Sequence, residues 1–78
     1  MIITVDQIMA LPRGPTGDIL EGTAPWSCSY VQIESVQPFK TPREGYFGIR
    51  LNFYNRDADP DKIEVVTFEC KEQVNFDS

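Results

Sequence analysis

The chain has 78 residues, of which 41% are hydrophobic, and its 12 acids and 7 bases give a formal net charge of -5 at pH 7. So short a chain forms a single domain, residues 1–78, with little room for a deep pocket. Five Phe, three Tyr and one Trp supply enough apolar volume for a core, which argues against intrinsic disorder.

The negative charge is concentrated towards the C-terminus. Residues 1–56 hold five acids and five bases, whereas residues 57–78 hold seven acids and two lysines, so the whole net charge of -5 arises in the last segment. A field of one sign repels phosphate and attracts basic surfaces. We therefore expect no direct binding of duplex DNA and a basic protein surface as partner.

Compartment is inferred from what the sequence lacks. No apolar run reaches the roughly 18 residues of a membrane span, and the N-terminus lacks the basic-then-apolar layout of a signal peptide. We expect no membrane association and a cytoplasmic location, which is the host cytoplasm if a phage encodes the chain. In that reducing compartment Cys28 and Cys70 are expected to be buried thiols.

The segment 4–11, TVDQIMAL, predicts a short helix. Thr4 and Gln7 have the spacing of a capping box, in which each side chain bonds a free backbone N–H of the other residue. Prolines and glycines in the following PRGPTG end the helix. A short strand is expected next, at 18–23, DILEGT.

A longer strand is predicted at 27–37, where Val31 and Ile33 alternate onto one face. Val36 falls out of phase, so a bulge near Ser35 is expected to return it inward. Pro38 should then lie at the strand end or on an edge of the sheet, because it cannot donate a ladder hydrogen bond.

The strongest strand pattern is YFGIRLNFY within 46–55, where apolar residues alternate without error. Four of them are expected to face the core: Phe47, Ile49, Leu51 and Phe53.

A third strand is predicted at 62–70, KIEVVTFEC. Val65 and Val66 interrupt the alternation between Ile63 and Phe68, so a second bulge is expected there. The last segment, QVNF at 73–76, is expected to pair at a sheet edge.

Short loops between these strands favour antiparallel neighbours, because parallel strands need long crossover connections. The expected fold class is α+β, with a short N-terminal helix and a three- to five-stranded antiparallel meander sheet. That sheet either stays open or curls into a small barrel, with the helix over one face or one opening.

The connection NRDADPDKIE carries an acidic turn, which we define as Asp57, Asp59 and Asp61. These three match the first ligand positions of a calcium loop, but Lys62 and Phe68 stand where that loop needs glycine and glutamate. No metal is therefore expected. Two roles remain open: a solvated connection whose aspartates bond nearby backbone N–H groups, or a contact surface for a cationic partner.

Catalytic chemistry is not indicated. The chain has no histidine, so the commonest general base and the usual partner of a catalytic Cys or Ser are missing. No phosphate-binding glycine loop is present either. We expect no enzyme activity and no cofactor.

The outward side of the 46–55 strand is a second candidate surface, which Trp26, Tyr30 and Gln32 of the neighbouring strand could extend. Exposed Tyr, Trp and Arg are typical of protein interfaces, and aromatics interleaved with arginine can also stack single-stranded bases. The alternative is that the helix or a second layer covers these side chains. The residues on the outward side of the 46–55 strand are Tyr46, Arg50, Asn52 and Tyr54.

Two functions are compared on these grounds. The first is a small, acidic, non-enzymatic inhibitor or adaptor that blocks a basic, nucleic-acid-handling protein. Phage proteins that disarm host defence, anti-CRISPR proteins among them, are similar in size, charge and lack of catalytic residues, without a shared motif. For the inhibitor or adaptor hypothesis, the predicted contact residues of this chain are the acidic turn, Glu64 and the outward residues Tyr46, Arg50, Asn52 and Tyr54. The alternative is a structural or single-stranded nucleic-acid-binding module that uses the aromatic and arginine face.

Overall fold

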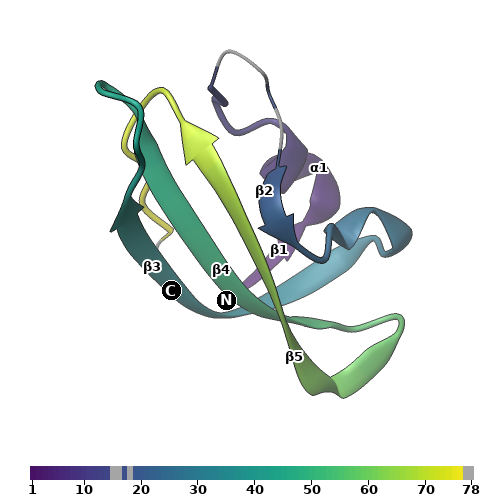
Figure 1. Ribbon diagram of the computed structural model, residues 1–78. Helices are drawn as coiled ribbons and strands as arrows, with labels where there is room; N and C mark the ends of the chain where they lie inside the picture. The colour runs from purple at the N-terminus through teal and green to yellow at the C-terminus, as the bar shows by residue number, and fades with distance from the viewer. Residues whose placement is uncertain (15–16, 18, 77–78) are drawn as a thin grey trace.

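The computed structural model describes residues 1–14, 17 and 19–76. Within them a single five-stranded antiparallel sheet forms, in the order β1-β3-β4-β5-β2 (Figure 1). The strands are β1 (Ile2–Thr4), β2 (Ile19–Gly22), β3 (Tyr30–Lys40), β4 (Phe47–Asn55) and β5 (Asp59–Cys70). The predicted antiparallel meander is confirmed for β3, β4 and β5. The alternative of a small barrel is wrong, because β1 and β2 remain separate edges of an open sheet.

Helical structure is limited, so the α+β label fits only loosely. The described residues hold the helix α1 (Val5–Met9) and one 3-10 turn, η1 (Pro25–Ser27). The predicted capping box is confirmed: Thr4 Oγ1 accepts from the Gln7 N–H at 3.1 Å, and Gln7 Oε1 accepts from the Thr4 N–H at 2.8 Å. Neither helix of the described chain is long and apolar enough to cross a membrane.

The predicted bulge in β3 is confirmed. The register with β4 shifts between Ile33, opposite Phe53, and Ser35, opposite Asn52, and this shift turns Val36 back onto the core side opposite Leu51. Pro38 lies inside β3 rather than at its end. Its missing N–H interrupts no ladder with β1, because β1 pairs only with Tyr30–Gln32.

The predicted bulge in β5 is wrong. Its register with β4 runs unbroken from Ile63, opposite Tyr54, to Cys70, opposite Phe47, and the irregularity falls at Tyr54/Asn55 instead. With strict alternation, Val66 and Phe68 face the core, whereas Ile63 and Val65 face the other side. The shorter β2 matches the strand expected at 18–23, of which Asp18 lies outside the described residues.

The core lies on one side of the sheet and includes Ile8 of α1. The predicted core residues of β4 are buried except Phe47, which is half-exposed because it lies at the first position of its strand. Residues 73–76 do not form the predicted edge strand; Val74 and Phe76 instead pack against the core and help to line a cavity of about 380 Å³. Eleven hydrophobic side chains are buried in the described part: Ile3, Ile8, Cys28, Val31, Ile33, Ile49, Leu51, Phe53, Val66, Phe68 and Cys70.

Candidate protein-binding surface

The side of the sheet that faces away from the core carries a row of paired residues across four strands. Gln32 pairs with Ile2 of β1 and with Tyr54 of β4, and Tyr54 pairs in turn with Ile63 of β5. Directly paired residues of antiparallel strands project to the same side, so this row is contiguous. Ile2 and Ile63, at its two ends, are 52% and 46% exposed.

A second row extends this surface. Asn52 pairs with Ser35 and with Val65, and the Asn52 side-chain amide donates to Ser35 Oγ at 2.9 Å. Tyr30, two positions before Gln32 on β3, adds another exposed aromatic side chain. We call these residues the open face: Ile2, Tyr30, Gln32, Asn52, Tyr54, Ile63 and Val65.

Among residues 1–14, 17 and 19–76, the helix α1 lies on the opposite side of the sheet from the open face. Ile8 of α1 lies in the same buried cluster as Val31 and Phe53, which project to the opposite side of the sheet. The alternative in which the N-terminal helix covers these side chains is therefore wrong for Tyr54 and Asn52.

The same side of the sheet is covered at its other end by the protein's own side chains. The Phe39 ring lies against Gly48, where an added Cβ would come within 2.7 Å of that ring. The Arg50 guanidinium lies 5.7 Å from the centroid of the same ring. The open face therefore ends near Arg50.

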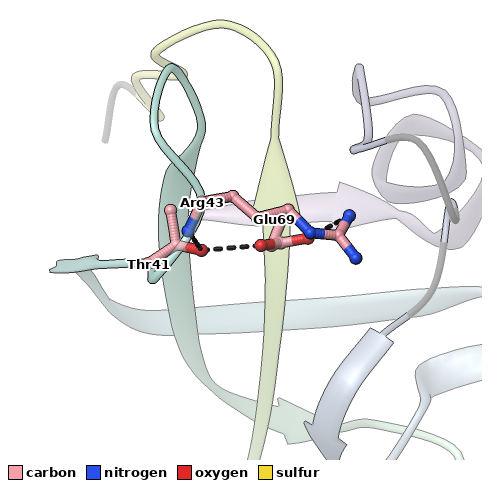
Figure 2. A network of polar contacts seen from close by, with 3 residues as sticks. All are labelled: Thr41, Arg43 and Glu69. Carbon is pink, nitrogen blue, oxygen red and sulfur yellow. Dashed lines mark hydrogen bonds and ion pairs between the residues drawn. The ribbon is translucent and has the colours of Figure 1, made fainter.

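Glu69 completes this covered end (Figure 2). Its carboxylate accepts a hydrogen bond from Thr41 Oγ1 at 2.6 Å and lies 3.2 Å from Arg43 Nη1. Thr41 and Arg43 belong to the connection between β3 and β4, and Glu69 pairs with Gly48 in the sheet. This is the one ion pair found among the described residues.

The acidic turn lies at the other end of the sheet, beside the open face, with Asp57 in the connection between β4 and β5 and with Asp59 and Asp61 in the first residues of β5. Asn55 Oδ1 accepts from the backbone N–H groups of Asp57 and Ala58, and Asp57 Oδ2 accepts from the Ser29 N–H at 2.9 Å. Asp59 Oδ1 accepts from the Asp61 N–H at 3.3 Å. Two of the three aspartates thus bond nearby backbone N–H groups, as one of the two interpretations of the turn predicts.

Asp61 joins the turn to the open face. Together with Pro60, Gln32 and Tyr54 it lines an open hollow of about 380 Å³. Two predicted contact residues from different parts of the sequence, Tyr54 and Asp61, are therefore neighbours in space.

Of the other predicted contact residues, Asn52 belongs to the open face, whereas Glu64, Tyr46 and Arg50 lie outside it. Glu64 pairs with Phe53 and so projects to the core side of the sheet. Tyr46 precedes β4, and its backbone N–H donates to the Arg43 carbonyl in the connecting turn. Three open-face residues were not anticipated as contacts: Ile2, Ile63 and Val65. Counting back by twos from the core residue Phe68 gives the inward positions Val66 and Glu64. The positions between them, Val65 and Ile63, then face outward, and this count is the signal that could have identified them.

The acids of the C-terminal segment do not form one surface. The acidic turn lies near the start of β5, whereas Glu69 and Glu72 lie at and after its far end. About 26 Å of extended strand separates Asp61 from Glu69, at about 3.3 Å per residue. Asp77 lies outside the described residues. The negative field at the open face therefore comes mainly from the acidic turn.

Reactive groups are few in the structure. No group of three His, Cys, Asp or Glu side chains in the described chain is placed to hold a metal ion. Both cysteines are free and buried. Burial raises the pKa of the Cys70 thiol, and burial followed by the negative charge of Asp57 raises the pKa of Cys28. Cys28 Sγ also donates to the Tyr30 carbonyl at 3.0 Å. A raised pKa favours the thiol over the nucleophilic thiolate at both cysteines.

Comparisons with protein-family models, curated proteins and solved structures give no match to this chain.

Proposed function

We propose that this chain is a non-enzymatic protein-binding inhibitor or adaptor, which docks its open face and acidic turn on a basic surface of a nucleic-acid-handling protein. The observation that carries the proposal is the pair of the half-buried Tyr54 and the exposed Ile63, with Asp61 beside Tyr54. Tyrosine rings and aliphatic side chains supply contact area, and the carboxylates attract a cationic partner.

Exposure of the open face supports a binding role. Single exposed apolar side chains are ordinary on a protein surface, but paired rows of them on one side of a sheet are typical of interaction sites. Ile2, Tyr30, Ile63 and Val65 are all exposed on this one surface. An apolar centre with charged residues at its border is the usual composition of a protein interface.

Charge favours a basic partner. The chain carries a net charge of -5, which speeds association with a cationic surface. Basic grooves on proteins commonly hold nucleic acid, so a compact acidic blocker of such a groove is the sharpest form of the proposal. Phage proteins of the anti-CRISPR type act on partners of this kind.

Single-stranded nucleic acid is less favoured as the ligand. Arg50 projects to the same side of β4 as Tyr54, but its guanidinium already lies over the Phe39 ring. The acidic turn beside Tyr54 would repel phosphate. Binding of an oligonucleotide is therefore an outcome that the test below has to exclude.

The test is capture from the native host followed by direct binding to the purified protein that is captured. We expect a basic, nucleic-acid-handling protein whose affinity falls between about 50 mM and about 500 mM salt. Ile63→Thr and Tyr54→Ala should each weaken binding about tenfold or more. Met9→Gln, which changes a similarly exposed apolar residue on α1, should leave the affinity unchanged.

Two results would contradict the proposal. One is a captured partner whose affinity does not respond to Ile63→Thr or Tyr54→Ala. The other is tight binding of a single-stranded oligonucleotide that Tyr54→Ala abolishes, which would favour the nucleic-acid module instead.

A further inference from the structure

The three carboxylates of the acidic turn differ in what they already bond. Asp57 accepts from the Ser29 N–H and Asp59 accepts from the Asp61 N–H. Asp61 itself neither accepts a hydrogen bond nor forms an ion pair with any residue in the described ranges 1–14, 17 and 19–76. Of the three, Asp61 is therefore the carboxylate available to a ligand.

Asp61 also lines the hollow that contains an aromatic ring and an amide. Tyr54 lies in a central strand, paired with Gln32 on one side and Ile63 on the other, so the ladder fixes its backbone and the side of the sheet to which its ring projects. Pro60 forms the remaining wall of the hollow with its rigid ring. A tyrosine, an aspartate and a glutamine thus border one open volume of about 380 Å³.

We propose that this hollow receives the guanidinium group of an arginine side chain, which under the proposed function belongs to the basic partner. A guanidinium is flat, so it can stack on the Tyr54 ring while its N–H groups donate to the Asp61 carboxylate and to Gln32 Oε1. A lysine ammonium lacks the flat face and the paired donors, and it is more strongly hydrated. The hollow should therefore prefer arginine to lysine.

The first experiment titrates the whole chain with a blocked tripeptide, glycine-arginine-glycine, and follows the backbone and side-chain amide signals by NMR. The same tripeptide with lysine in the centre is the matched control. We expect weak, saturable binding with shifts at Gln32, Tyr54 and Asp61. The arginine peptide should bind about threefold to fivefold more tightly than the lysine peptide.

Two variants test the assignment of residues. Asp61→Asn and Tyr54→Leu should each weaken arginine binding about threefold or more. Asp6→Asn removes the same charge from α1, away from the hollow, and should leave the titration unchanged. The comparison of the two peptides on the unaltered protein keeps the proposal testable if Tyr54→Leu fails to fold.

The proposal is overturned if arginine and lysine peptides bind equally, if the shifts spread over carboxylates throughout the chain, or if Asp61→Asn has no effect. This failure is distinct from failure of the proposed function. A partner that binds through the open face, without arginine selectivity at the hollow, would leave the protein-binding role in place. A third result is selective arginine binding together with captured proteins whose affinity does not change on substitution of Tyr54 or Ile63. It would support the arginine site and contradict the proposed protein-binding function.

Discussion

Among the described residues, Glu69 is the only buried acid, and its side chain is 5% exposed. A buried carboxylate costs free energy unless its oxygens are bonded. Both oxygens of Glu69 have a partner, but the two partners are not equivalent: the bond from Thr41 is buried, whereas the Arg43 side chain is 42% exposed. Water therefore screens the ion pair with Arg43 more than it weakens the hydrogen bond from Thr41.

The two partners of Glu69 should differ in their effect on stability. Thr41→Val leaves a carboxylate oxygen unbonded and should lower the free energy of unfolding by about 1–3 kcal/mol. Arg43→Met keeps the aliphatic part of the side chain and should lower it by about 0–1 kcal/mol. Urea denaturation of the two variants measures the difference. A larger loss for Arg43→Met would mean that the ion pair, rather than the hydrogen bond, stabilises Glu69.

The sequence predicts the hydrogen bonds between Thr4 and Gln7 but not the hydrogen bond between Thr41 and Glu69. The reason is how far apart the two partners lie along the chain. Thr4 and Gln7 are three residues apart, so helix geometry alone brings them together, and the capping box is confirmed. Thr41 and Glu69 are 28 residues apart. Their contact depends on the register of β4 against β5, which no local pattern contains.

The strands β4 and β5 differ in how well their buried side can be predicted from the sequence. In β4 the apolar residues alternate without interruption, so its buried side could be predicted from the sequence. In β5 the adjacent Val65 and Val66 leave the phase ambiguous, and the buried polar residues Thr67 and Glu69 hide the alternation further. Ile63 and Val65 were therefore not recognised as part of the open face.

One substitution made at two adjacent positions tests this phase. Val66 is fully buried, so Val66→Thr places a hydroxyl in the core and should lower the free energy of unfolding by about 1–3 kcal/mol. Val65 is 36% exposed on the open face, so Val65→Thr should change it by less than about 0.5 kcal/mol. Thermal or urea unfolding compares the pair directly. Equal losses, or a larger loss for Val65→Thr, would indicate a bulge between the two valines.

For the whole molecule, the kind of secondary structure decides how a cluster of charges in the sequence is distributed in space. The eight residue-to-residue steps from Asp61 to Glu69 span about 26 Å in a strand and would span only about 12 Å in a helix. Because β5 is a strand, the acidic turn lies towards one end of the molecule and Glu69 and Glu72 lie towards the other, and the longest dimension of the molecule is 36 Å. A count of charges along the chain predicts the net charge correctly but not the shape of the field.

This division predicts which acids steer a basic partner to the open face. Asp59→Asn and Glu72→Gln each change the net charge from -5 to -4, but only Asp59 lies in the acidic turn. At about 0.15 M salt charges act over about 8 Å, so Asp59→Asn should slow association about twofold while Glu72→Gln leaves the rate unchanged. At about 0.01 M salt the range grows to about 30 Å, and both variants should slow association. Stopped-flow or surface binding kinetics with the captured partner measure these rates. Equal slowing at the higher salt would mean that the partner docks elsewhere, or that the net charge of the whole chain, rather than the acidic turn, sets the rate of encounter.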